Sequence, residues 1–227
     1  MSHARKSNLL VGSPVERIED LRFLRGRGQY VDDLVLDGLL HVAILRSSVA
    51  HGRIRSIDAK AALALRGVHA VITAQDVLEV LGGMPRIPLR QEAMPAFKHF
   101  EQPVIAHEKV RYVGEPVAVI VADSPALAED ALEAVALDIE FLPVVASRNA
   151  GDVVLLAESA GSNCAATLTA VLGDADAAFR DAPYVRCERF RVQRHTAVPM
   201  EARGLLAEWD ATRGHMTVHG ASKVAFA

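Results

Sequence analysis

The sequence has few cysteines, no long apolar run and no strong excess of either charge. Its two cysteines, Cys164 and Cys187, lie too far apart for a CxxC motif and cannot alone build an iron–sulfur or structural zinc site. The apolar run over 116–122 is far shorter than the roughly 18 residues that span a bilayer. Residues 9–11 are too short for a signal-peptide core. We therefore predict a cytoplasmic protein with reduced cysteines and no membrane segment.

The charges nearly balance, with 25 basic and 28 acidic side chains and a net charge of −3. A dedicated nucleic-acid binder normally carries a basic excess or patch, and neither is present. Hydrophobic residues make up 51% of the chain, which excludes intrinsic disorder. The 227 residues leave room for one large domain or two small ones.

Short catalytic signatures are also missing. The sequence contains no GxSxG, HExxH, GxGxxG or GxxxxGK[ST] motif. His215 and His219 would share one face of a helix, but Thr217 and Val218 favour a strand, on which the two histidines lie about 13 Å apart. We therefore predict no metal site and no catalytic residue within this chain.

Local patterns in the first two thirds of the chain predict a mixed α/β (α+β) fold. Asp58 is the predicted N-cap of a first helix, Thr73 and Asp76 form a capping box for a second, and Ser124 begins a third. The predicted helices cover residues 59–66, 74–81 and the stretch after Ser124. The predicted strands cover residues 39–46, 53–57, 68–73, 117–122 and 138–141.

Two stretches interrupt this pattern. Residues 82–103 contain four prolines and are predicted to form a long surface loop, which is a candidate contact surface. Residues 148–173 are rich in small side chains, lack periodicity and are predicted to be a linker. Beyond them, the sequence predicts a helix over 174–180 and strands over 184–194, 204–208 and 215–219, the beginning of a mostly antiparallel sheet.

Two acidic positions receive structural interpretations. Glu115 precedes the apolar run after Gly114, and a tight turn into the sheet is favoured over a functional role. Glu201 and Arg203 lie on one face of an extended segment, where a structural ion pair is favoured.

The order of several segments resembles the molybdopterin-binding large subunit of the xanthine dehydrogenase, aldehyde oxidase and carbon monoxide dehydrogenase family. The matching segments are 25–33 (RGRGQYVDD), 46–54 (RSSVAHGRI), 73–77 (TAQDV), 109–118 (KVRYVGEPVA) and Leu142-Pro143. They are similar to the a/b hammerhead domain of that family, and the resemblance implies such a domain over residues 15–147.

The remaining residues resemble the start of the first molybdopterin-binding domain of the same family. The segments that carry this likeness are 173–179 (GDADAAF), 193–195 (QRH) and 200–204 (MEARG), where Ala202 replaces the usual proline. The resemblance implies a linker over 148–173 and an incomplete molybdopterin-binding domain over 174–227.

This resemblance implies a molybdenum hydroxylase, an oxidoreductase that hydroxylates an aldehyde, an N-heterocycle or a similar small substrate with oxygen from water. Its cofactor is molybdenum–molybdopterin, in the cytosine dinucleotide form, with FAD and [2Fe-2S] clusters on partner subunits. The metal makes a water-derived nucleophile available at neutral pH and accepts electrons, which side chains cannot do.

The family's glycine-rich cofactor stretch and its catalytic glutamate are expected outside this chain, so the chain alone is predicted to be inactive. Lys223 stands where the family usually has a cofactor-proximal glutamine, and it is the candidate cofactor-binding residue; an exposed lysine is the alternative. The expected partners are the rest of the molybdenum subunit, the iron–sulfur and flavin subunits, or a second copy of the chain. The alternative function is a non-catalytic assembly module that uses residues 82–103 as its contact surface.

Overall fold

The computed structural model describes residues 12–88, 95–147, 150–151, 154–193, 195–199 and 203–221. The chain divides into two compact units, one over Gly38–Arg189 and one that combines Met1–Asp37 with Phe190–Ala227. The predicted domain boundaries at 147 and 174 differ from this division and remain a prediction. No helix among the described residues is long and apolar enough to cross a membrane.

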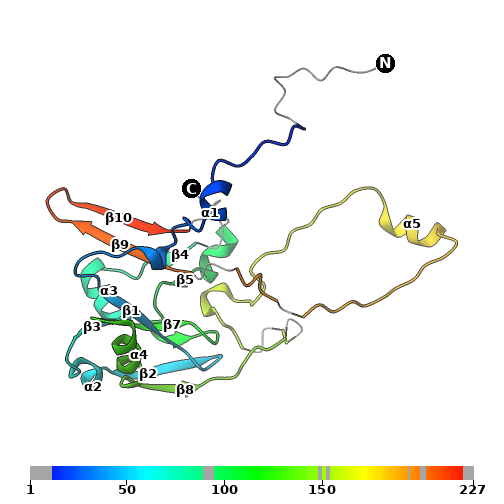
Figure 1. Ribbon diagram of the computed structural model, residues 1–227. Helices are drawn as coiled ribbons and strands as arrows, with labels where there is room; N and C mark the ends of the chain where they lie inside the picture. Colours follow the sequence, from blue (N-terminus) through cyan, green and yellow to red (C-terminus); the bar gives the residue numbers. More distant parts are fainter. Residues whose placement is uncertain are drawn as a thin grey trace, which may run out of the picture. The chain divides into compact units, whose positions relative to one another are not determined.

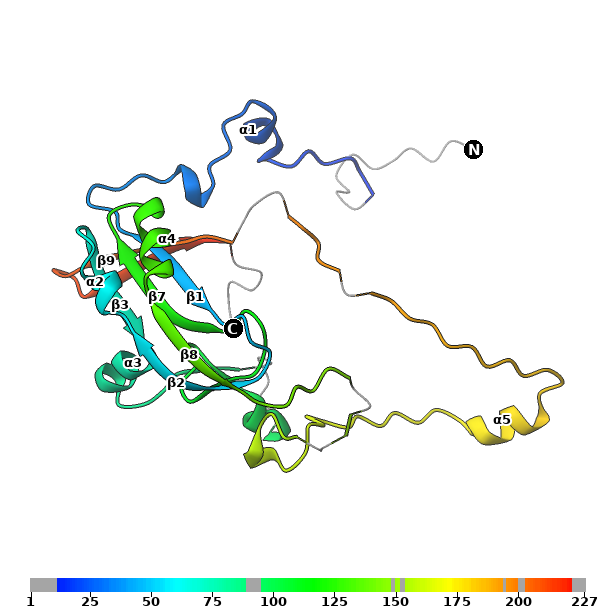
Figure 2. The ribbon, with the colours of Figure 1, turned by 90° about the horizontal axis from the view of Figure 1, so that it is seen from below.

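The unit Gly38–Arg189 contains two antiparallel three-stranded sheets (Figure 1). In the first, β7 (Pro116–Ala122) lies between β1 (His41–Arg46) and β3 (Val68–Thr73). In the second, β2 (Gly52–Asp58) lies between β6 (Lys109–Val110) and β8 (Ala136–Phe141). Figure 2 shows β1, β7 and β3 side by side from below. The five predicted strands of this region are confirmed.

The strand β7 is the centre of the core. Val117, Ala118, Ile120 and Ala122 are buried, whereas Val119 and Val121 are half-buried. Ile120 packs in one cluster with Ala62 of α2 (Lys60–Leu63) and with Ala131 of α4 (Pro125–Glu133). β7, α4 and β8 follow one another along the chain, but the two strands lie in different sheets.

Helix boundaries follow the capping chemistry in the sequence. Ser124 Oγ accepts a hydrogen bond from the Leu127 N–H (3.2 Å) at the start of α4. Asp76 Oδ2 accepts from the Thr73 N–H and hydroxyl (both 2.7 Å) at the start of α3 (Ala74–Leu81), which lowers the pKa of Asp76. Both predicted caps are confirmed.

The predicted helix over 59–66 is wrong in its extent, because α2 covers only Lys60–Leu63. Ala59 takes the N-cap position instead of Asp58, whose carboxylate accepts from the Lys60 N–H (3.0 Å). Gly67 follows with φ +92°, a conformation that disfavours other residues, and leads directly into β3.

The described part of the predicted 82–103 loop contains more structure than expected. Short strands β4 (Arg86–Ile87) and β5 (Gln102–Pro103) pair, and a 3-10 helix covers Pro95–Phe100. Residues 89–94 lie outside the described residues.

After residue 163, the described part of the unit contains one helix, α5 (Ala175–Asp181), which confirms the helix predicted over 174–180; Asp174 is its N-cap and accepts a hydrogen bond from the Ala177 N–H (2.8 Å). The predicted strand over 184–194 is wrong for its described part, because residues 184–193 form no strand. A strand needs a hydrogen-bonded neighbour, and no described segment pairs with these residues.

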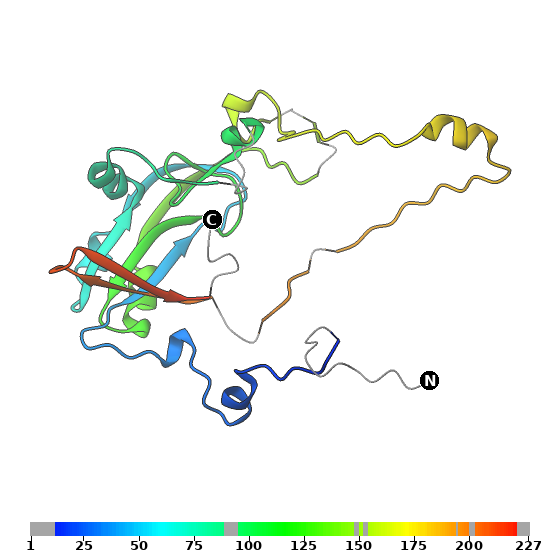
Figure 3. The ribbon, with the colours of Figure 1, turned by 90° about the horizontal axis from the view of Figure 1, so that it is seen from above.

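The second unit contains α1 (Asp20–Leu24), a 3-10 helix (Val31–Asp33) and one antiparallel hairpin. The hairpin strands are β9 (Leu205–Asp210) and β10 (His215–Gly220), drawn in red in Figure 3. They confirm the strands predicted over 204–208 and 215–219. His215 and His219 therefore lie on a strand, as predicted.

Gly52 allows the close approach of β2 and β8. A Cβ at this position would lie 2.3 Å from Ile139 Cγ2 and 2.9 Å from the Glu140 carbonyl oxygen. We predict that Gly52→Ala lowers the free energy of unfolding by about 1–3 kcal/mol, because the added methyl overpacks the sheet. Gly83→Ala is the control, since a Cβ at Gly83 would meet no atom within 4 Å. Equal urea midpoints for the two variants would contradict the prediction.

Candidate functional site

The turn between β6 and β7 contains a buried carboxylate. Glu115 is only 1% exposed, and its Oε2 accepts a hydrogen bond from the Arg111 N–H (2.6 Å). The Glu115 N–H donates to the Tyr112 carbonyl (3.3 Å), which confirms the predicted turn. Burial raises the pKa of Glu115, while the Arg111 N–H and guanidinium oppose that shift.

The same turn is tied to the end of β1. The Ser47 N–H donates to the Glu115 carbonyl (2.9 Å), and the Gly114 N–H donates to the Ser47 carbonyl (2.7 Å). Arg46 Nη1 donates to the Gly114 carbonyl (2.9 Å). The two sequence segments 46–54 and 109–118, more than 50 residues apart, therefore meet in one polar junction.

Arg111 extends this junction to the segment that was predicted as linker. Its Nε donates to the Leu156 carbonyl (2.9 Å), and its Nη1 donates to the Lys109 carbonyl (3.3 Å). Lys109 in turn forms an ion pair with Glu158, and this hydrogen bond holds the pKa of Glu158 below its ordinary value. Two neighbouring cations thus anchor residues 156–158 to the turn.

The anchored segment has its own internal support. Asn163 Oδ1 accepts from the Leu156 N–H (2.9 Å), and Asn163 Nδ2 donates to the Val154 carbonyl (2.7 Å). His99 Nδ1 lies 3.1 Å from Ser159 Oγ. Part of the 148–173 segment is therefore fixed on the first unit by side-chain contacts, although its described residues form no strand or α-helix.

A second buried polar side chain, His51, lies at the start of β2. It is 3% exposed, and its Nδ1 lies 2.7 Å from the Pro143 carbonyl oxygen. Because a carbonyl only accepts, Nδ1 carries the proton, and the buried Nε2 has no partner among the described residues. The Leu142 N–H also donates to the His51 carbonyl (3.0 Å), so the segments 46–54 and 142–143 are linked.

The prediction of a cofactor-binding residue in this chain rests on Lys223 alone. Lys223 and the 200–202 part of the MEARG segment lie outside the described residues, so the Lys223 prediction is untested, as is the Glu201–Arg203 pair. His195 is exposed, and its Nδ1 lies 3.4 Å from the Gln193 carbonyl oxygen. No group of three His, Cys, Asp or Glu side chains that could hold a metal occurs among the described residues.

Sequence reasoning missed the junction between Arg111 and Leu156. The residues lie 45 positions apart, and no local pattern indicates their contact. The resemblance in segment 109–118 marked Arg111 as part of a motif, but it gave no structural reason for the arginine.

We predict that Glu115→Ala lowers the free energy of unfolding by about 1–3 kcal/mol, because the buried Arg111 N–H loses its acceptor. Glu115→Gln keeps an acceptor and should lose less. Because folding raises the pKa of this carboxyl, the wild type gains stability relative to the Gln variant as the pH falls from 7 toward the ordinary value of 4.5. Urea unfolding across this pH range measures the difference, and the opposite slope would contradict the prediction.

Arg111→Ala is predicted to release the 154–163 segment. A lost hydrogen bond to a charged group, worth about 1.5–3 kcal/mol, speeds amide exchange in this segment by about tenfold or more. Hydrogen exchange with mass spectrometry measures the rate. Arg55→Ala is the matched control, because Arg55 forms an exposed ion pair with Glu140 (2.8 Å) away from the segment. Unchanged exchange at 154–163 in Arg111→Ala would show that the junction does not hold it.

Two family models match the chain in sequence order. Residues 25–143 match the aldehyde oxidase and xanthine dehydrogenase a/b hammerhead domain, and residues 156–227 match the molybdopterin cofactor-binding domain. The first match contains the β6–β7 turn and His51. The second match begins at Leu156, whose carbonyl oxygen accepts a hydrogen bond from Arg111 Nε.

Curated relatives match over most of this chain. The nicotine 6-hydroxylase large subunit of Paenarthrobacter nicotinovorans is 38% identical over 210 residues, covering 91% of this chain and 25% of the relative. The carbon monoxide dehydrogenase large chain of Hydrogenophaga pseudoflava is 36% identical, covering 88% and 26%. The chain thus spans about a quarter of the length of these relatives.

Solved structures agree with these matches. The quinoline 2-oxidoreductase from Pseudomonas putida 86 matches with a TM-score of 0.74 and 35% identity, over 92% of this chain and 26% of that chain. The Cu,Mo-CO dehydrogenase matches with the same TM-score and identity. With its predicted hammerhead fold thus confirmed, the chain belongs to the aldehyde oxidase and xanthine dehydrogenase family of molybdopterin-dependent oxidoreductases.

Proposed function

We propose that the chain serves as the N-terminal part of a molybdenum hydroxylase large subunit. The observation that carries this proposal is the order of the two matches, a hammerhead domain followed by a molybdopterin cofactor-binding domain. The relatives are named as large subunits or chains of nicotine 6-hydroxylase and carbon monoxide dehydrogenase, which supports a subunit role. The reaction is oxidative hydroxylation of a small molecule, with oxygen from water.

An open apolar depression among the described residues is lined by Phe179, Tyr184 and alanines of α5 and its C-terminal end, with Arg186 as its charged residue. Arg186 already pairs with Glu188, so this depression lacks the converging donors that a molybdopterin phosphate requires. We therefore assign no catalytic step to the described side chains.

Within this proposal, the hammerhead part acts as a scaffold. The junction of Glu115 and Arg111 fixes the beginning of the cofactor-domain match, at residues 156–158, on the hammerhead sheets. The bound cofactor, proposed in its cytosine dinucleotide form, supplies the hydroxylation chemistry. Lys223 is the proposed residue of this chain near the cofactor.

The proposed assembly includes the rest of the molybdenum subunit and partner subunits that carry FAD and [2Fe-2S] clusters, and it is cytoplasmic. We propose that electrons leave through these partners. Without the rest of the subunit, the chain is proposed to be inactive.

A chimeric large subunit tests the proposal. The chain replaces the matching quarter of the quinoline 2-oxidoreductase chain from Pseudomonas putida 86, and the chimera is produced in the host and under the conditions used for that enzyme. We predict about one molybdenum per chimera, because a mononuclear cofactor is completed by both parts. The chain alone should contain no stoichiometric molybdenum. Elemental analysis and pterin fluorescence measure the content.

The unaltered quinoline 2-oxidoreductase is the positive control. A soluble, folded chimera without molybdenum and pterin would contradict the proposal and favour a non-catalytic assembly module. Stoichiometric molybdenum in the chain alone would contradict the proposed need for the rest of the subunit.

A further inference from the structure

The hairpin of β9 and β10 presents an apolar face to solvent. In the register of the hairpin, Trp209 pairs with Met216 and Ala207 pairs with Val218. Leu205, Trp209, Met216 and Val218 are 74%, 58%, 55% and 56% exposed. Successive side chains of a strand point to opposite faces, so these four side chains and Ala207 lie on the same face of the hairpin. This face carries five neighbouring apolar residues and no charge.

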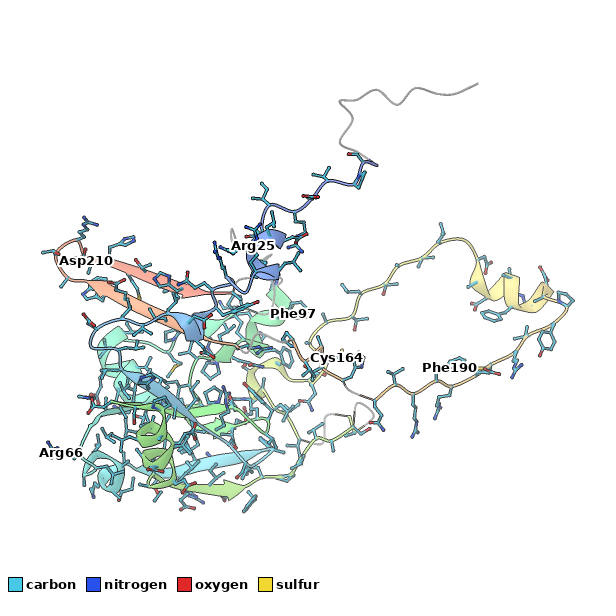
Figure 4. All side chains as sticks on the ribbon, viewed as in Figure 1. Arg25, Arg66, Phe97, Cys164, Phe190 and Asp210 are labelled. Carbon is cyan, nitrogen blue, oxygen red and sulfur yellow. The ribbon has the colours of Figure 1, made fainter. Side chains whose placement is uncertain are left out.

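The hairpin geometry is fixed without help from this face. Asp210 Oδ1 accepts from the Thr212 N–H (2.9 Å) and the Arg213 N–H (3.2 Å) in the connecting turn, and Figure 4 labels Asp210 at this end of the hairpin. Leu206, on the opposite face, is 6% exposed. A Cβ at Gly204 would lie 3.3 Å from Val31 Cγ1, so the start of β9 approaches the N-terminal segment closely. The face is therefore an ordered surface.

The area of the face indicates what kind of partner it fits. From the size of such side chains, the five residues expose on the order of 500 Å². A stable interface between two proteins needs about 800 Å² per partner, so a second copy docked on this face alone is a poor fit. A two-stranded hairpin gains its stability by packing as one layer against another apolar layer.

The sequence context identifies that layer. The hairpin lies inside the match to the molybdopterin cofactor-binding domain, over 156–227. Other apolar side chains in this match are equally uncovered, including Phe179 (65% exposed) and Phe190 (83%), the latter labelled in Figure 4. The relatives continue for about three quarters of their length outside the matched region.

We propose that the face formed by Leu205, Ala207, Trp209, Met216 and Val218 is the surface on which the remaining part of the large subunit docks. The occupant is an apolar helix or sheet face of that part. This inference rests on the proposed function and names the side chains of this chain that join its two parts.

Hydroxyl-radical footprinting with mass spectrometry tests the proposal, because Trp209 and Met216 both oxidise readily when exposed. The chain alone is compared at low and high concentration with the chimera described above. We expect both residues to react at all concentrations in the chain alone. In the chimera, their oxidation rates should fall at least several-fold.

Two substitutions on neighbouring residues give a second readout. Val218→Lys places a charge on the proposed docking face, whereas Thr217→Lys places it on the opposite face, across from Glu208. Val218→Lys should lower the melting temperature of the chimera and leave that of the chain alone unchanged. Thr217→Lys should lower neither melting temperature, because a lysine opposite a glutamate is not repelled.

Three outcomes would overturn the proposal. Protection of Trp209 that rises with the concentration of the chain alone would identify a second copy as the occupant. Unprotected Trp209 in a chimera that contains molybdopterin would refute the docking face while leaving the proposed function intact. A folded chimera without molybdopterin would contradict the proposed function, and with it the proposal that the rest of the large subunit docks on this face.

Discussion

The buried carboxylate of Glu115 is the interaction on which the arrangement of the first unit depends. It lies in the turn where β6 of one sheet becomes β7 of the other, and it accepts the Arg111 N–H in a place that water does not reach. A buried charge without partners costs several kcal/mol, about as much as the net stability of many domains. The carboxylate therefore requires the turn to keep one conformation, and that conformation aims the Arg111 side chain at Leu156.

The consequence reaches beyond the two sheets. Because Arg111 and Lys109 both bind residues of the 156–158 segment, the beginning of the cofactor-domain match is attached to the hammerhead part by charge-assisted contacts. The Lys109–Glu158 pair contributes less, because the Glu158 carboxylate is largely exposed and water screens its charge. The partly buried Arg111 contact has less competition from solvent and carries more of the attachment.

Local chemistry explains which parts of the fold could be predicted from the sequence. The caps at Ser124 and Thr73 involve residues only three positions away, so the local sequence predicts them. The apolar run of β7 likewise predicts a strand without any information on the neighbouring strands. The contact between Arg111 and Leu156 joins distant residues and leaves no local pattern. Residues 184–193 have the composition of a strand but no partner among the described segments, so composition alone predicted the wrong state. The resemblance indicated the family, yet its one candidate cofactor residue, Lys223, lies outside the described residues.

The two matched parts differ in how much of their apolar side-chain surface they bury. In the hammerhead part, β7 lies between two strands and under α4, so Val117 and Ile120 are fully buried by the chain itself. In the cofactor-domain part, Trp209 and Phe190 remain mostly exposed, although β9 and β10 have a complete hydrogen-bonded ladder. Backbone pairing is thus satisfied within the hairpin, whereas side-chain burial is not. Since burial supplies most of the stabilising free energy of a domain, the cofactor-domain part depends on another apolar layer far more than the hammerhead part does.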